Sequence, residues 1–476
     1  MLSVKYVIGI VTLATVAITA MYGCTDTGSG PAKGLSVSRP NVVIFLTDDQ
    51  GTLDLKSFGA EDLLTPNLDR LAEEGIKFTQ AYAHTVCVPA RAAMLTGRYP
   101  QRTGINNWTQ GNAHAEQGVN MHLSEVTLAE LLKDHGYRTG IFGKWHLGAD
   151  LNHGPLSQGF DYFYGHRGGF IDNFQHYFLH GQGFHDLWRN GEEIHENGKY
   201  FPNRTVEETK GYIDRNLDQP KLLYIALNIP HYPEQAWHHR LRFEQVYRHL
   251  DQPRQSYAHM VSTADYLIGE VIQHLKDRGE YEETLFVFMS DNGHSEEDAE
   301  ITQDHHNSGL PKGTYYGANG GGGFTGKWMG HKGTHLEGGI RVPFILSFPA
   351  CLPGGIERNQ ITTSMDILPT ISELLDIPLP DRPLDGYSLL PVIQEDASSP
   401  YRERVLYFHW QNRWTVRRGN WKLIKDREGT LHLANLAGEN PERKNWISEH
   451  PERAEELEML HDEWLEEVMS DGGLSE

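Results

Sequence analysis

Cys87-Val88-Pro89-Ala90-Arg91, followed by Ala92-Ala93-Met94-Leu95-Thr96-Gly97-Arg98, is the stretch around which the chain is organised. Pro89 suits the first turn of a helix, where its missing N–H costs no hydrogen bond, and the residues after it are mostly good helix formers. We therefore expect Cys87 at a helix N-terminus, where free amides and the helix dipole favour anionic groups. Arg91, one turn further on, is expected to point to the same place. From these features alone, Cys87 is equally well interpreted as a buried structural cysteine before an ordinary helix.

The spacing Cys87-x-Pro89-x-Arg91, with the tail Leu95-Thr96-Gly97-Arg98, resembles the signature of type I sulfatases, which belong to the alkaline phosphatase-like superfamily. The resemblance implies that a formylglycine-generating enzyme oxidises Cys87 to Cα-formylglycine and that the hydrated aldehyde is the nucleophile. Ala90 departs from the pattern, because many members have Ser there. The cysteine, proline and arginine of the pattern are intact.

The composition is that of a globular protein with an acidic surface. The chain has 476 residues, of which 38% are hydrophobic and 22% charged, enough for one large domain and a smaller one. A net charge of −22 argues against a nucleic-acid or anionic-membrane binder. The same charge is unfavourable for an anionic substrate, so we expect a local basic pocket within an acidic surface.

The N-terminal segment is predicted to direct export. Lys5 precedes the apolar run from Val7 to Ala20, which is typical of a secretory signal over residues 1–24, and a polar linker follows over 25–39. Cys24 after a small residue also resembles a bacterial lipoprotein cleavage site, although Met21 and Tyr22 fit that pattern poorly. Lipidation of Cys24 therefore stays open, and the expected location is periplasmic, outer-membrane lipoprotein or secreted. A retained membrane anchor is the second interpretation, although the run is only marginally long enough to span a bilayer.

Apolar, β-branched runs alternate with amphipathic segments, which predicts an α/β fold with a large, mostly parallel sheet flanked by helices. The stretch from Ile76 to Tyr82 is expected to form one of the strands. A catalytic domain is predicted over 40–385, with a Pro-rich boundary at 378–391. Residues 386–476 are predicted to form a small antiparallel sheet and a terminal helix over 451–469. The resemblance implies an alkaline phosphatase-like fold.

Short polar clusters follow four of the predicted strands. They are Asp48-Asp49 after strand 41–47, Lys144 and His146 after strand 137–142, His231 after strand 222–228, and Asp291-Asn292 after strand 285–290. Each cluster alone is also typical of a solvated turn or loop. Because ligands bind at the carboxyl edge of open α/β sheets, we expect the clusters to converge near Cys87. Adjacent carboxylates repel one another unless a cation lies between them, and oxygen ligands suit Ca²⁺ or Mg²⁺ better than zinc.

The resemblance assigns roles to these side chains. It implies one Ca²⁺ per chain, with the metal ligands Asp48, Asp49, the modified Cys87, Asp291 and Asn292. Lys144 and Lys332 are expected to bind sulfate oxygens, and Arg91 and His146 to orient and activate the nucleophile. His231, with Lys332, is expected to protonate the leaving alcohol.

Two further predictions concern loops. Lys332 begins the marker Lys-x₄-Glu-Gly-Gly-x-Arg-Val-Pro, in which Glu337 and Arg341 are expected to form a structural pair. The His- and aromatic-rich segment 152–199 contains His166 and Arg167, which we predict to contact substrate. An irregular, poorly packed insertion is the alternative interpretation of this segment.

The predicted function is hydrolysis of sulfate esters of a carbohydrate. A sulfated polysaccharide or oligosaccharide of algal type is the first expectation, and a glycosaminoglycan the second. Three alternatives stay open: a phosphomonoesterase or phosphodiesterase of the same superfamily, a non-catalytic binder of sulfated glycans with unmodified Cys87, and a hydrolase that uses the Cys87 thiolate with a metal.

Overall fold

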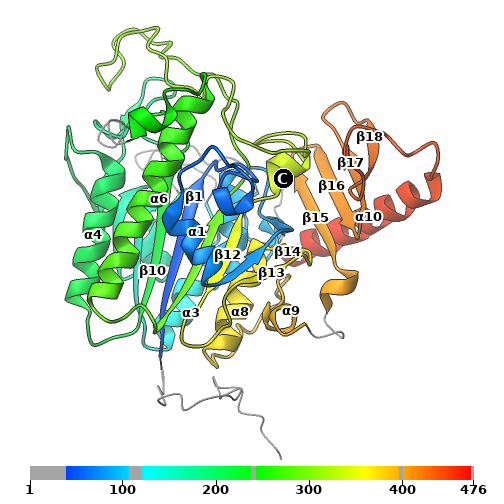
Figure 1. The fold of residues 1–476 in the computed structure, drawn as a ribbon, viewed down its shortest axis with the longest axis horizontal. Coiled ribbons are helices and arrows are strands. Elements are labelled where there is room, and N and C mark those ends of the chain that lie inside the picture. Colours follow the sequence, from blue (N-terminus) through cyan, green and yellow to red (C-terminus); the bar gives the residue numbers. More distant parts are fainter. Residues whose placement is uncertain (1–38, 107–119, 149, 237–242, 396–399, 473–476) are drawn as a thin grey trace, which may run out of the picture. The chain divides into compact units, whose positions relative to one another are not determined.

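The computed structural model describes residues 39–106, 120–148, 150–236, 243–395 and 400–472. A ten-stranded sheet forms the centre of the described residues, in the order β13-β2-β12-β11-β1-β10-β4-β5-β8-β9 (Figure 1). Its strands are β1 (Asn41–Asp48), β2 (Ile76–Phe78), β4 (Arg138–Lys144), β5 (Tyr162–His166), β8 (Trp188–Arg189), β9 (Glu192–Glu193), β10 (Lys221–Pro230), β11 (Thr284–Ser290), β12 (Phe344–Ser347) and β13 (Ile356–Arg358).

The five central strands, from β11 to β5, run parallel, and the antiparallel pairs lie towards the two edges. Every residue of β1, β10 and β11 is buried, as expected for a sheet covered on both faces. Since the parallel strands point the same way, the residues that follow β1, β4, β10 and β11 meet at one edge. The predicted α/β fold with a mostly parallel sheet is therefore confirmed.

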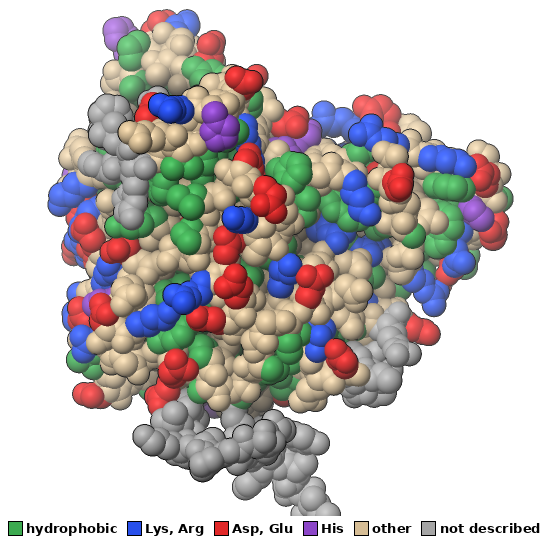
Figure 2. Space-filling model, viewed as in Figure 1, with side chains coloured by type: hydrophobic (Ala, Val, Ile, Leu, Met, Phe, Trp, Pro, Cys, Tyr) green, Lys and Arg blue, Asp and Glu red, His purple; other side chains and the backbone are tan. Residues whose placement is uncertain are grey.

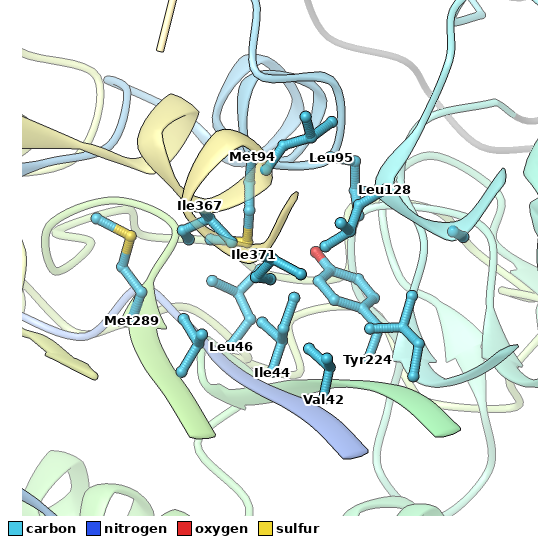
Figure 3. Packing of buried hydrophobic residues seen from close by; sticks show 14 of the residues in the cluster. Val42, Ile44, Leu46, Met94, Leu95, Leu128, Tyr224, Met289, Ile367 and Ile371 are labelled. Atoms are coloured by element: carbon cyan, nitrogen blue, oxygen red, sulfur yellow. The ribbon is translucent and has the colours of Figure 1, made fainter. Parts of the chain in front are cut away.

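Alternation along β1 places side chains on both faces of the sheet. On one face, Val42, Ile44 and Leu46 pack with side chains of α2 (Cys87–Thr96), α3 (Leu128–Asp134) and α8 (Ile367–Leu374), as Figure 3 shows. Met94 and Leu95 are among the five α2 residues in this core, so the core fixes the helix that begins at Cys87.

On the opposite face, Val43 and Phe45 belong to a second core with side chains of α1 (Pro66–Glu73), α4 (Phe201–Arg215) and α6 (Arg254–Asp277). The α6 helix carries the 3.6-residue apolar stripe visible in the sequence, and that stripe is core. The expected single strand from Ile76 to Tyr82 is wrong. The chain turns after β2, and β3 (Ala81–Tyr82) pairs instead with β14 (Thr362–Thr363) in a separate ladder.

The C-terminal part contains a four-stranded antiparallel sheet and a long helix (Figure 1). The strands are β15 (Val405–Trp410), β16 (Arg413–Arg418), β17 (Trp421–Lys425) and β18 (Leu431–Asn435), and the helix is α10 (Pro451–Gly472). The short helices α7 (Glu337–Ile340) and α9 (Leu390–Ile393) precede them. The predicted antiparallel sheet and terminal helix are confirmed.

The predicted export signal 1–24, Cys24 and the linker up to residue 38 lie outside the described residues. Among the residues that are described, no helix combines the length and the apolar character that a membrane span requires.

Candidate active site

Cys87 is the first residue of α2, after Val86 in extended conformation, and Pro89 lies in the first turn as predicted. Its side chain is buried, and its Sγ lies 3.4 Å from Asp48 Oδ1, to which the thiol donates. The segment before the helix is held by the Thr85 carbonyl, which accepts a hydrogen bond of 2.7 Å from the Gly333 amide. Cys87 therefore lies at the N-terminus of α2 with its side chain next to the carboxyl end of β1.

Arg91 lies one turn along α2 and is fully buried. Its Nε and Nη2 donate to Asp291 Oδ2 at 3.0 and 2.7 Å, and Nη1 donates to the Lys144 carbonyl at 3.0 Å. Nη2 also lies 3.7 Å from Asp48 Oδ2. Arg91 therefore connects the ends of β1, β4 and β11 in one cluster.

The acidic residues after β1 and β11 lie together, as the strand order requires. The Asp49 amide donates to Asp291 Oδ1 at 3.2 Å, and Asn292 Nδ2 donates to Asp49 Oδ1 at 2.7 Å. Asp49 has a φ of +62°, a conformation that L-residues adopt rarely and that occurs often at functional sites. Asp48, Asp49, Asp291 and Asn292 are all buried.

Two lysines approach the carboxylates from different elements. Lys144 Nζ, at the end of β4, donates to Asp48 Oδ2 at 2.7 Å. Lys332 Nζ donates to Asp49 Oδ2 at 3.0 Å and lies 3.1 Å from His231 Nε2. With Arg91, the cluster pairs three buried cations with three buried carboxylates.

His231 is held in one tautomer. Its Nδ1 lies 2.6 Å from the Tyr232 carbonyl, which can only accept, so Nδ1 carries the proton and the Nε2 lone pair faces Lys332. Burial, followed by the charges of Lys332 and Lys144, lowers the pKa of His231 well below its usual value. His231 is therefore a neutral acceptor next to an ammonium donor.

His146 is buried and has a φ of +58°. Its amide donates to the Arg167 carbonyl at 3.2 Å, and a Cβ added to Gly169 would lie 3.1 Å from its Cε1. Gly143, with a φ of +112°, lies so close to β10 that an added Cβ would be 1.9 Å from the Ala226 carbonyl oxygen. The chain therefore needs glycine at 143 to bring Lys144 to the cluster, whereas activation of the nucleophile by His146 stays a prediction.

His166 and Arg167, which we predicted to contact substrate, have other contacts here. His166 is fully buried and pairs with Lys144 across β4 and β5, and its Nδ1 lies 3.0 Å from the Gly168 carbonyl. Arg167 donates through Nη2 to the Leu151 carbonyl at 3.2 Å and stacks over Trp188. Both residues support the β5 end of the cluster, and substrate contact stays a prediction.

The three carboxyl groups have different proton affinities. Burial raises the pKa of Asp48, but the charges of Lys144, Arg91 and Lys332 outweigh it and lower the pKa overall. Burial raises the pKa of Asp49 to about 7, helped by Asp48 and Asp291 and opposed by Lys332. Burial and Asp48 likewise raise the pKa of Asp291 against the charge of Arg91. Additional positive charge would therefore be stabilised beside Asp49 and Asp291.

The residues fit a divalent cation. Ligand atoms of Asp48, Asp49, Cys87 and His231 all lie within 4.8 Å of one another. Asn292 Oδ1 is buried and has no hydrogen-bond donor among the described residues. A buried acceptor without a donor is costly, and a carboxylate and amide oxygen set suits a hard cation. His231 belongs to this group, whereas the sequence predicted it only beside the leaving group.

Several contacts were not found from the sequence. Glu297 Oε2 lies 3.4 Å from Lys332 Nζ, and the Phe170 ring stacks on His231 at 5.4 Å between centroids. The Tyr232 ring lies under Lys332 at 5.8 Å. Phe170 and Tyr232 lie in segments rich in aromatic and histidine residues, which was the available signal, whereas nothing around Glu297 in the sequence pointed to the site.

The expected pair of Glu337 and Arg341 is confirmed, with Arg341 Nη1 3.3 Å from Glu337 Oε2. The carboxylate has a wider role than holding a turn, because it also accepts from Tyr82 Oη at 2.6 Å and Lys422 Nζ at 2.9 Å. Lys422 is on β17, so Glu337 connects the segment that follows Lys332 to the C-terminal sheet.

Comparison with known proteins agrees with this geometry. Residues 40–377 match the family model described as Sulfatase, and residues 327–470 match the model for the C-terminal part of N-sulphoglucosamine sulphohydrolase. Human steryl-sulfatase is 30% identical over 458 residues, which cover 80% of this chain and 74% of that protein. Human arylsulfatase A is 30% identical over 441 residues, which cover 85% and 79%.

Among solved structures, Ps i-CgsB in complex with k-i-k-neocarrahexaose has a TM-score of 0.76 and 26% identity, over 90% of this chain and 92% of that one. The family model spans more than half of the chain, and the motif residues Cys87, Arg91 and Lys332 lie within it. The chain therefore belongs to the sulfatase family of the alkaline phosphatase-like superfamily and is a sulfuric ester hydrolase.

Proposed function

We propose that this sulfatase hydrolyses sulfate esters of a carbohydrate, with formylglycine formed from Cys87 as the nucleophile and Ca²⁺ as the metal. The observation that carries the proposal is the position of Cys87 Sγ, 3.4 Å from one oxygen of Asp48 while Lys144 Nζ lies 2.7 Å from the other. The side chain at position 87 thus lies between the group of predicted metal ligands and a lysine suited to a sulfate oxygen.

The unmodified thiol is a poor nucleophile in this environment. Burial, and then the charge of Asp48, raise the pKa of Cys87 well above its usual value, so the side chain stays a protonated thiol. Without a bound metal, Cys87 is therefore a weak nucleophile. Hydrated formylglycine supplies a hydroxyl nucleophile at the same position, and a bound Ca²⁺ supplies positive charge that polarises the sulfate group.

The side chains around Cys87 supply the remaining functions. Lys144 and Lys332 present ammonium groups that offset negative charge developing on sulfate oxygens. When the S–O bond to the sugar breaks, the leaving oxygen needs a proton. Lys332 is 3.1 Å from the unprotonated Nε2 of His231, so these two groups can hold and pass that proton. Arg91 keeps Asp291 in place through two N–H donors.

For the substrate we propose a sulfated galactan of algal type, in particular a carrageenan-type oligosaccharide. Support comes from Ps i-CgsB, which was solved with k-i-k-neocarrahexaose. A glycosaminoglycan is the second candidate, favoured by the match of residues 327–470 to an N-sulphoglucosamine sulphohydrolase model.

We also propose that the chain is exported and is matured by a formylglycine-generating enzyme. The apolar run from Val7 to Ala20 supports export. Metabolic labelling with a clickable palmitate analogue separates the alternatives at Cys24: label lost in Cys24→Ala supports a lipoprotein, and an unlabelled exported chain supports a cleaved signal.

The first test is mass spectrometry of the tryptic peptide containing Cys87, from protein produced with a formylglycine-generating enzyme. We expect a loss of about 18 Da relative to the thiol. The same preparation is assayed with 4-nitrophenyl sulfate, 4-nitrophenyl phosphate and sulfated oligosaccharides, with Cys87→Ala as the control. An unmodified thiol in protein from the native source would refute formylglycine as the nucleophile. A higher activity on 4-nitrophenyl phosphate than on 4-nitrophenyl sulfate would refute sulfate esters as the substrate class.

A further inference from the structure

Glu297 is a carboxylate at the edge of the reaction site to which the proposed reaction gives no role. Its Oε2 lies 3.4 Å from Lys332 Nζ, and 42% of its side chain is exposed, whereas the Lys332 side chain is only 3% exposed. Asp and Glu side chains are spread over the face drawn in Figure 2, as the net charge of −22 requires. A surface carboxylate is therefore ordinary in this chain, and what sets Glu297 apart is its contact with a buried ammonium group.

The ammonium group of Lys332 has three acceptors around it. Asp49 Oδ2 lies at 3.0 Å, His231 Nε2 at 3.1 Å and Glu297 Oε2 at 3.4 Å, which matches the three N–H donors of a lysine. Asp49 and His231 belong to the group of ligand atoms that fits a divalent cation, whereas Glu297 lies outside that group. Glu297 is therefore a partner of Lys332 that the metal site does not also need.

The other active-site lysine has no such partner. Lys144 Nζ lies 2.7 Å from Asp48 Oδ2, and among the residues that the structure describes no carboxylate outside the metal group lies within ion-pair distance of it. The additional carboxylate is thus specific to Lys332, the lysine beside His231. These two residues are also the ones that we expect to supply the proton to the leaving oxygen.

Glu297 is itself held in place by the chain around it. The Ser295 hydroxyl donates to Glu297 Oε2 at 3.1 Å and accepts the Glu297 amide at 3.2 Å. The Glu297 carbonyl accepts the Ala318 amide at 2.7 Å, and the Lys332 amide donates to the His294 carbonyl at 2.8 Å. The backbone segments that carry the lysine and the carboxylate are therefore hydrogen-bonded to each other, so little conformational entropy is lost when the two side chains pair.

The charges of this pair support each other. Burial raises the pKa of Glu297, but the charge of Lys332 and the hydrogen bonds from Ser295 and Lys332 outweigh it and lower the pKa overall. The Tyr232 ring, with its centroid 5.8 Å from Lys332 Nζ, adds an uncharged contact to the same ammonium group. Without the carboxylate of Glu297, the strongest attraction left for Nζ is Asp49, which would draw it away from the leaving group.

We propose that Glu297 is a positioning residue, which keeps Lys332 Nζ beside His231 Nε2 so that the leaving oxygen receives its proton. The proposal rests on the function proposed above, in which Lys332 and His231 hold and pass that proton. Glu297 acts through Lys332 and not by contact with the sulfate group. Its removal should therefore matter most for substrates whose leaving oxygen depends on protonation.

The test compares two substrates that differ in the basicity of the leaving oxygen. 4-Nitrophenyl sulfate releases a phenolate that the nitro group stabilises, whereas phenyl sulfate releases a more basic phenolate, which depends more on a proton donor. Both carry one sulfate on a single ring, and kcat/KM includes the step in which the leaving group departs. The ratio of the two kcat/KM values, measured in one preparation, does not depend on the fraction of chains that carry formylglycine.

In Glu297→Gln we expect kcat/KM to fall about tenfold for phenyl sulfate and about twofold for 4-nitrophenyl sulfate, so that their ratio changes about fivefold. Glu297→Asp keeps the charge and should change the ratio less. The matched control is Glu296→Gln, because Glu296 is 45% exposed and lies 3.6 Å from His294 and 3.4 Å from His331. Its ratio should stay within about 1.5-fold of the wild type. Thermal unfolding of each variant checks that the fold is intact.

Lys332→Ala separates this inference from the proposed function. If Lys332→Ala changes the ratio and adding Glu297→Gln changes it no further, the carboxylate acts through the lysine. If Lys332→Ala changes the ratio but Glu297→Gln leaves it at the wild-type value, the inference is overturned, while proton delivery by Lys332 stands. If neither variant changes the ratio, proton delivery by Lys332 is wrong as well, and Glu297 has nothing to position.

Discussion

Glu337→Gln should destabilise the connection between the catalytic centre and the C-terminal sheet. Glu337 is fully buried and accepts from Tyr82 Oη at 2.6 Å, Lys422 Nζ at 2.9 Å and Arg341 Nη1 at 3.3 Å. Glutamine keeps the size of the side chain but removes the charge. Its NH₂ group then faces donors rather than acceptors.

Breaking a buried ion pair by removing one partner costs about 3–5 kcal/mol, since the other charge is left without compensation. Lys422 keeps Glu442 at 3.0 Å, so we expect the lower end of this range for Glu337→Gln, about 3 kcal/mol. In the double variant Glu337→Gln/Lys422→Met both charges are gone. Its cost should fall short of the sum of the single variants by at least about 1 kcal/mol.

The measurement is equilibrium unfolding in urea, followed by tryptophan fluorescence, for the wild type, the two single variants and the double variant. Glu456→Gln, which removes the partner of the exposed Arg418, is the control and should cost less than about 1 kcal/mol. If Glu337→Gln costs no more than this control, or if the single-variant costs add exactly, the charges of Glu337 and Lys422 do not act together and the reasoning is refuted.

Three further predictions follow from the site. Gly143→Ala should lower the free energy of unfolding by about 2 kcal/mol, because residue 143 has a positive φ and the added Cβ would clash with the Ala226 carbonyl. The control Gly191→Ala, which has open space around the added Cβ, should leave the Tm unchanged. Arg91→Lys should lower kcat/KM on 4-nitrophenyl sulfate at least about a hundredfold, since lysine cannot replace both N–H donors to the same carboxylate; a loss below tenfold would contradict this. In the metal-free protein the pKa of Asp49 is raised from 3.8 to about 7, so the folded state binds the Asp49 proton more tightly than the unfolded state does. The stability gained from this proton is fully present below pH 3.8 and is lost as the pH rises through 7. Calorimetry with Ca²⁺ and with EDTA should therefore show a larger Ca²⁺-induced increase in Tm at pH 8 than at pH 5, and an equal increase would count against Asp49 as a ligand.

Much of the fold could be predicted from local pattern. The strands β1, β10 and β11 appear in the sequence as continuous apolar runs, and the stripe of α6 follows the helical period. The split between β2 and β3 could not be predicted in this way, because β3 pairs with a strand about 280 residues further on, as the register of Ala81 with Thr362 shows. Such pairing depends on long-range contacts that leave no local signal.

The sequence alone determined which groups are available to the site: a cysteine at a helix start, carboxylates at strand ends and lysines in short motifs. Tertiary structure decided how they combine. Only the strand order brings Asp48 next to Asp291, and only the loop path brings Lys332 within 3.1 Å of His231. It also decided that His166 is buried. The physical reason is that motif residues are set by local chemistry, whereas proton affinity and charge pairing depend on burial and on neighbours distant in the chain.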